Sequence, residues 1–334
     1  MDQRTHAWIA IRAVALLDDE GACPNLVKLL KPYLHAAAVG SWIPDKRDAK
    51  IGGSDTDNHI LKMEPYRGEQ VARFTLTKPE LLKKLGKHRV MSTFLAENAS
   101  LDDSWWKTPY KANPQPGQHI ADRAGALTTT IIDLLIMGNQ ELATLIPNRY
   151  QFAEELEPKA RSQAEQAALY FYMQSHFIAD ASMPCHCDAR KLSSYGNGLH
   201  KELESHWSQK IGVYFDDKRL ESTTDPPATI LGNAKAVDTT FSITFKNEVP
   251  QLNERDVWLE TIYICRGSFA VASIIAPPES HGYGQETLAP FNTVLEQRPE
   301  LLRKVDEVAL HDAVLNVAIT WKHLWNQLQK KSEK

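Results

Sequence analysis

The chain has 334 residues, 43% of them apolar, and a formal net charge of −4 at pH 7. This length and composition favour a globular chain with a substantial core. The balanced charge and the lack of a long basic run exclude a module that holds duplex DNA stably by its phosphates. No stretch of 18 or more apolar residues occurs, so we expect no transmembrane segment.

The first helical pattern covers residues 5–18, with Thr5 as the expected N-cap. Arg12 interrupts its apolar run and no small-residue cleavage site follows, which favours a helix over a signal peptide. As written, the chain is therefore expected to be cytoplasmic, or secreted or periplasmic if a leader was removed. A second helix is expected over residues 25–39, ended by Gly40.

Residues 41–61 are rich in Gly, Asp, Asn and Pro, and we expect a loop there. Loop-rich insertions are expected near residues 99–118 and 211–247. Helical apolar spacing recurs over residues 79–98, 119–138, 161–181, 199–210, 252–276 and 299–329. Because an alternating strand pattern is almost absent, the sequence predicts an all-α, multi-helix fold with a single domain over residues 1–334.

One short stretch concentrates potential metal ligands, in the order His176, Asp180, His186, His200 and Glu204. The first two and the last two are each four residues apart, so each pair projects from one face of a helix. Pro184 is expected to end the first of these helices and to leave His186 in the turn that follows. A single pair of this kind is usually a surface or core contact. Two pairs in tandem predict a metal site, because burying so many ionisable groups without a cation is costly.

Three more candidate ligands lie upstream, at His6, Asp45 and His59. The combined set of eight His and carboxylate side chains is too large for one tetrahedral zinc ion. It suits two or three ions that share a bridging carboxylate. Such clusters activate a bound water and clamp the oxygens of a phosphate ester.

Several short motifs give the chain a resemblance to a known family. They are THAWIAIRA at residues 5–13, GSWIPD at 40–45, HIL at 59–61, HFIADASMPCH at 176–186 and HKELE at 200–204. In their order and spacing they resemble the zinc-dependent phospholipase C and single-strand-specific nuclease family. The resemblance implies an all-helical fold with a trinuclear zinc site.

Carried over to this sequence, the resemblance implies one zinc ion at Asp45, His59, His176 and Asp180, and a second at His186, His200 and Glu204. A third would take His6, the other oxygen of Asp180, and the amine and carbonyl of the first residue. That residue is a tryptophan in the family and Met1 here. Either Met1 is retained and its amine chelates the ion, or the third site is incomplete and Asp2 substitutes as a ligand.

The activity that the resemblance implies is zinc-dependent hydrolysis of a phosphodiester, as in phospholipase C, with Asp45 as the general base. The alternatives are a single-strand nuclease of the same family and a non-catalytic structural zinc protein. The substrate class stays open between a phospholipid, a single-stranded nucleic acid and a small phosphate ester. Trp42, Tyr66 and Phe177 are candidate substrate contacts by their proximity in sequence. Cys185 and Cys187 are expected to be thiols, small buried neighbours of the site rather than ligands.

Overall fold

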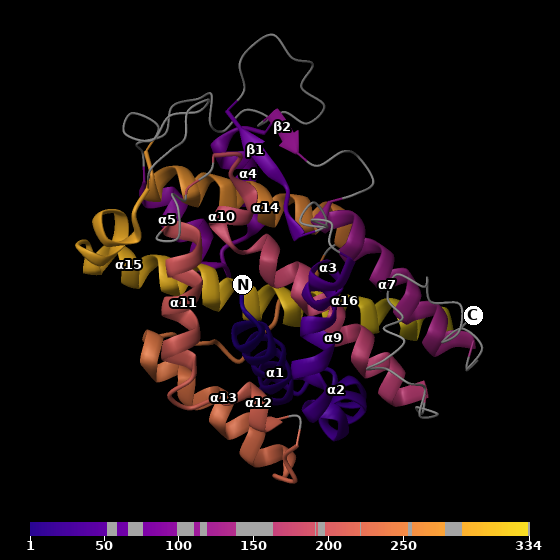
Figure 1. The fold of residues 1–334 in the computed structure, drawn as a ribbon. Helices are drawn as coiled ribbons and strands as arrows, with labels where there is room; N and C mark the ends of the chain where they lie inside the picture. The colour runs from indigo at the N-terminus through magenta and orange to yellow at the C-terminus, as the bar shows by residue number, and fades with distance from the viewer. Residues whose placement is uncertain are drawn as a thin grey trace.

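The computed structural model describes residues 1–51, 59–65, 76–98, 110–113, 119–137, 163–190, 192, 198–220, 222–252, 256–277 and 289–332. Within these ranges the chain is mostly helical, and its strands form one short antiparallel pair (Figure 1). The prediction of an all-α fold is confirmed.

The N-terminal half contains α1 (Gln3–Glu20), α2 (Pro24–Leu30), η1 (Lys31–Ala36), α3 (Ala37–Ile51), β1 (Lys62–Glu64), α4 (Lys78–Leu85), α5 (Val90–Glu97), β2 (Tyr110–Asn113) and α7 (Ile120–Met137). The C-terminal half contains α9 (Gln163–Ala181), α10 (Pro184–Cys187), α11 (Leu199–Ile211), α12 (Asp217–Leu220), α13 (Pro227–Phe241), α14 (Val257–Ile275), η4 (Asn292–Glu296), α15 (Pro299–Asp306), η5 (Glu307–His311) and α16 (Asp312–Ser332).

Helix α9 lies at the centre of the fold, in contact with α1, α3, α7, α14 and α16 (Figure 1). Every residue from 167 to 188 is buried, which continues through the end of α9 into α10. A helix buried on all sides is a core helix rather than an amphipathic surface helix. Side chains on α9 are therefore held by neighbours on every side.

Helix α1 is also a core helix, and the chain begins inside the helical body (Figure 1). Its N-cap is Asp2, whose Oδ1 accepts a hydrogen bond from the Thr5 amide at 3.0 Å. The prediction of Thr5 as the cap was wrong by one turn, because Asp2 offers an equally good acceptor at the true helix start.

Gly40 does not end a helix as predicted but lies within α3, which continues to Ile51 with Pro44 inside it. The expected loop is therefore wrong over residues 41–51, while residues 52–58 lie outside the described part of the chain. A Cβ atom at Gly40 would lie 2.7 Å from the Cβ atom of Tyr172 on α9. The glycine is there because the two helices approach closely, and not because the chain turns.

The expected insertion over residues 211–247 is largely helical, and α13 packs on α1. There the Trp8 indole donates to the Ala234 carbonyl at 2.9 Å, and Arg12 pairs with Asp238 at 2.8 Å. Of residues 99–118, only 110–113 are described, and they form β2, which pairs with β1. The helix expected over 79–98 is divided into α4 and α5 after Gly86, whose φ is +79°.

Among the described residues, α14 is long and apolar enough to cross a membrane by length and composition. Of the 18-residue window that meets this test, 78% is buried inside the protein. Burial of this kind is typical of a core helix.

Candidate metal centre

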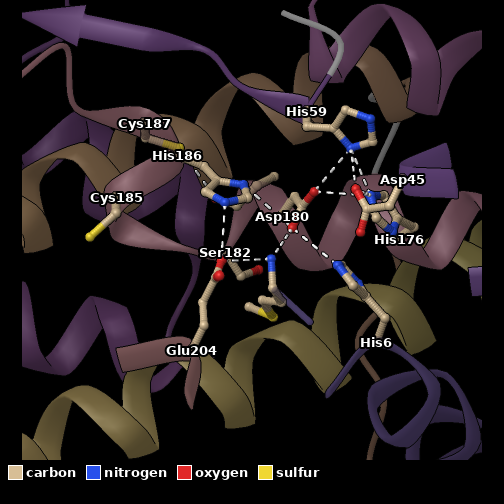
Figure 2. A network of polar contacts seen from close by, with 12 residues as sticks. His6, Asp45, His59, His176, Asp180, Ser182, Cys185, His186, Cys187 and Glu204 are labelled. Atoms are coloured by element: carbon tan, nitrogen blue, oxygen red, sulfur yellow. Dashed lines mark hydrogen bonds and ion pairs between the residues drawn. The ribbon is translucent and has the colours of Figure 1, made fainter. Parts of the chain in front are cut away.

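The structure brings the predicted ligands from six separate segments into one cluster (Figure 2). They are His6 on α1, Asp45 on α3, His59 just before β1, His176 and Asp180 on α9, His186 on α10, and His200 and Glu204 on α11. The ligand atoms form three groups, and within each group they all lie within 4.8 Å of one another. The groups are His6, Asp45 and His176; His59, His176 and Asp180; and His186, His200 and Glu204. Such groups can hold metal ions.

Asp180 lies at the centre of the cluster, with only 1% of its side chain exposed (Figure 2). Its Oδ2 atom lies 3.1 Å from His176 Nε2 and 3.4 Å from His59 Nδ1. Its Oδ1 atom lies 3.3 Å from His6 Nε2 and 3.1 Å from the Met1 amine. The two oxygens thus face two different sets of candidate metal-ligand atoms, called donors below, which is the arrangement of a carboxylate that bridges two ions.

The first set of donors surrounds Oδ2. His59 Nδ1 and His176 Nε2 are 2.7 Å apart, and Asp45 Oδ1 lies 3.7 Å from the first and 3.6 Å from the second. Asp45 is the solvent-exposed ligand of this set, because 27% of its side chain is exposed while the His176 side chain is fully buried.

The orientation of His176 depends on a backbone group that no sequence pattern indicated. Its Nδ1 donates to the Ser41 carbonyl at 2.7 Å, which directs the Nε2 lone pair toward Asp45 and Asp180. Ser41 can reach His176 because Gly40 lets α3 approach α9. A carbonyl acceptor can be supplied by any residue, so its identity left no trace in the sequence.

The second set is His186, His200 and Glu204. His200 Nε2 lies 3.0 Å from His186 Nε2 and 2.8 Å from Glu204 Oε1. With 37% of the His200 side chain and 22% of the Glu204 side chain exposed, these two ligands face solvent. His186 was expected to lie in a turn, but it lies in the short helix α10, which begins at Pro184.

The third set contains the amine of Met1, which lies 3.1 Å from Asp180 Oδ1 and 2.9 Å from Glu204 Oε1. Among the described residues, neither ring nitrogen of the buried His6 has a hydrogen-bond partner. A buried imidazole that makes no hydrogen bond but lies 3.3 Å from a carboxylate and near an amine fits a metal ion. Asp2, the alternative ligand, is instead engaged as the cap of α1.

Burial sets the protonation of this cluster. It lowers the pKa of His6 well below 6.5 and that of His186 to about 4, so both rings are neutral ligands at pH 7. Burial opposes the ionisation of Asp180, but the Met1 ammonium and His186 hold its pKa well below 3.8. Burial also disfavours the Met1 ammonium, but Asp180 and Glu204 raise its pKa to about 12. A metal ion that binds the amine must therefore displace a proton.

The metal-free protein is expected to be most stable between about pH 6.5 and 8. Below pH 6.5 the unfolded chain binds protons that the buried His6 and His186 do not, so the free energy of unfolding falls with falling pH. Above pH 8 the unfolded chain loses the amine proton that Met1 retains in the folded chain, so the free energy of unfolding falls with rising pH. Urea unfolding in EDTA from pH 5 to 10 measures this curve. A flat profile between pH 5 and 7 would contradict the neutral state of the histidines.

The three candidate substrate contacts differ in their positions relative to the metal centre. Phe177 is 2% exposed, and its ring lies 5.4 Å from those of both His59 and His176, so it supports these ligands and is not a rim residue. Trp42 is half-buried on α3, three residues before Asp45. Tyr66 lies outside the described residues.

The cysteines at the site are free thiols and are buried. Neither Cys185 nor Cys187 belongs to the three groups of potential ligands among the described residues. The Cys185 sulfur points away from the histidines (Figure 2). Their interpretation as buried neighbours rather than ligands agrees with this geometry.

Comparison with known proteins gives no relative: no family model matches the chain, and no curated protein or solved structure matches it significantly. The site's chemistry must therefore be inferred from its own geometry.

Proposed function

We propose that this chain is a zinc-dependent phosphoesterase that hydrolyses a phosphodiester, as phospholipase C does. The observation that carries the proposal is the position of Asp180, whose two oxygens face separate sets of donors. Imidazole nitrogen and carboxylate oxygen are ligands that zinc accepts. The order of these ligands along the chain also supports membership of the zinc-dependent phospholipase C and single-strand nuclease family.

The ions would be held as the resemblance implies. Asp45, His59, His176 and Asp180 would hold one, His186, His200 and Glu204 a second, and His6, Asp180 and Met1 a third. When bound, zinc lowers the pKa of a water molecule and stabilises charge on the leaving oxygen of a phosphate ester.

Asp45 is the residue we assign as general base. Burial raises the pKa of its carboxyl group, and the neighbouring Asp180 adds to this effect. The zinc ions that Asp45 would help to hold lower this pKa again, so the assignment rests on the family resemblance and on the exposure of Asp45. With 27% of its side chain exposed, Asp45 is open to a water molecule at the edge of the cluster.

A structural zinc site is the main alternative from another class, and in it protein ligands fill every coordination position and leave none open for water. The partial exposure of Asp45, Glu204 and His200 favours an open centre instead. A single-strand nuclease of the same family remains the alternative within the enzyme class.

Elemental analysis combined with an activity assay tests the proposal. We expect two or three zinc ions per chain, and turnover of bis(p-nitrophenyl) phosphate that EDTA abolishes and added zinc restores. One zinc ion or none, together with no turnover, would refute it. A panel of phosphatidylcholine, single-stranded DNA, RNA and phosphomonoesters, assayed with zinc present, then identifies the substrate class.

A further inference from the structure

Residues 181–183, the last residue of α9 and the two that follow it, form the short turn into α10 and lie between two ligands of the centre. Asp180 precedes this turn and His186 follows it, and Asp180 Oδ1 lies 3.4 Å from His186 Nδ1. All three residues of the turn are fully buried. Any change in its conformation would move these two ligands, and with them the two neighbouring ion sites to which they belong, relative to each other.

Two helices that carry no ligand hold this turn in place. From α14, the Ser268 hydroxyl donates to the Ala181 carbonyl at 2.7 Å. From α16, the Asn316 side-chain amide donates to the Ser182 hydroxyl at 3.1 Å. Ala181 is otherwise approached by the thiol of Cys187 at 3.6 Å, which is a weak donor. The turn thus has hydrogen bonds from α14 and α16 in addition to its local ones, in which the Ser182 amide donates to the Ala179 carbonyl and the Met183 amide to the Asp180 carbonyl, both at 3.0 Å.

Asn316 is itself fixed by a buried ion pair. Its side-chain oxygen accepts from Arg89 Nε at 2.6 Å, and Arg89 Nη2 lies 2.5 Å from Glu260 Oε1 on α14. Arg89 is 5% exposed, Glu260 1% and Asn316 fully buried. Buried, connected polar groups of this kind are rigid, because breaking one bond leaves its partner unsatisfied. The network therefore has little freedom to let the turn move.

We propose that Ser268 and Asn316 are positioning residues for the metal centre, which act by fixing the turn between Asp180 and His186. Neither residue is among the candidate ligands. Their role is to hold Asp180 and His186, which belong to neighbouring ions of the centre, in the relative positions that those ions require before they arrive. This inference rests on the metal centre of the proposed function, but its test requires no substrate.

The test is the zinc affinity of Ser268→Ala, measured by competition with a chromophoric chelator. Loss of a group that orients ligands typically weakens metal binding about 10- to 100-fold, and we expect a loss of about tenfold or more here. The substitution removes one hydroxyl and adds no bulk. Ser182→Ala, which removes the acceptor of the Asn316 bond, is a second variant with the same expected direction.

Ser273→Ala is the matched control. Ser273 is also fully buried on α14, but its hydroxyl donates to the Phe269 carbonyl of the same helix at 3.0 Å. We expect this variant to keep wild-type zinc affinity. Thermal unfolding in EDTA separates a general loss of stability, which Ser273→Ala would share, from a loss specific to the centre.

Equal zinc affinities of Ser268→Ala and Ser273→Ala would overturn the positioning role, and so would a wild-type chain that binds no zinc. The outcome is separate from that for the phosphoesterase. Zinc binding that weakens in Ser268→Ala without any phosphodiester turnover supports the positioning role and contradicts the enzyme. Turnover with equal affinities supports the enzyme and contradicts the positioning role.

Discussion

Asp180→Asn is expected to remove at least one zinc ion per chain and to lower phosphodiester turnover by at least about 100-fold. An asparagine offers one oxygen, and its amide nitrogen is not a metal ligand at neutral pH. The one remaining oxygen of the variant can bind the ion near His6 or the ion near His176, but not both. It also removes a negative charge that faces the Met1 ammonium at 3.1 Å. Turnover of bis(p-nitrophenyl) phosphate and zinc content, measured on the same preparation, check this expectation.

Asp217→Asn is the control for this substitution. Asp217 is also buried, at 4% exposure, and pairs with Arg4 at 3.0 Å without belonging to the candidate ligand groups of the described chain. We expect it to lose stability while it keeps its zinc. Full zinc content in Asp180→Asn would show that the carboxylate does not bridge two ions.

The ligand pairs on single helices were predictable from the sequence because the four-residue spacing is local. His176 and Asp180 meet on α9, and His200 and Glu204 meet on α11, as a helix dictates. Local spacing cannot show that His6, about 170 residues earlier than His176, stacks on its ring at 3.9 Å. That contact depends on the packing of α1 against α9. The upstream ligands His6, Asp45 and His59 were predicted from the chemistry of their side chains and from the family resemblance.

The parts that the sequence did not reveal depend on tertiary contacts. Glycine is usually a sign of a chain turn, but Gly40 is required by the close approach of α3 to Tyr172. Residues 227–241 contain Gly, Asn and three Thr, which are weak helix formers, yet they form α13, which packs on α1. Ser41 acts through its backbone carbonyl, Ser268 through one hydrogen bond and Asn316 through two, and contacts of this kind leave no recognisable pattern in a sequence. Tertiary packing outweighed local propensity at each of these positions.

Blocking the amine of Met1 is expected to weaken one zinc ion selectively. A Gly-Ser extension converts the amine into an amide, which has no lone pair for a metal ion at neutral pH and no charge for Asp180 and Glu204. The amine is fully buried, so added residues must also displace its surroundings. Zinc titration of the metal-free protein should show one binding event at least about tenfold weaker, with the other ions retained.

The same two residues added after Lys334 provide a control that leaves the amine free. A removable extension allows a rescue experiment. Cleavage that restores a chain beginning at Met1 should also restore binding of the lost zinc ion. Mass spectrometry of the intact protein identifies the N-terminus in each preparation. The ions held by His59 and by His200 depend on donors that the extension does not alter, so they should survive it. An unchanged stoichiometry and affinity in the extended chain would assign the ion near His6 to other ligands and exclude the amine.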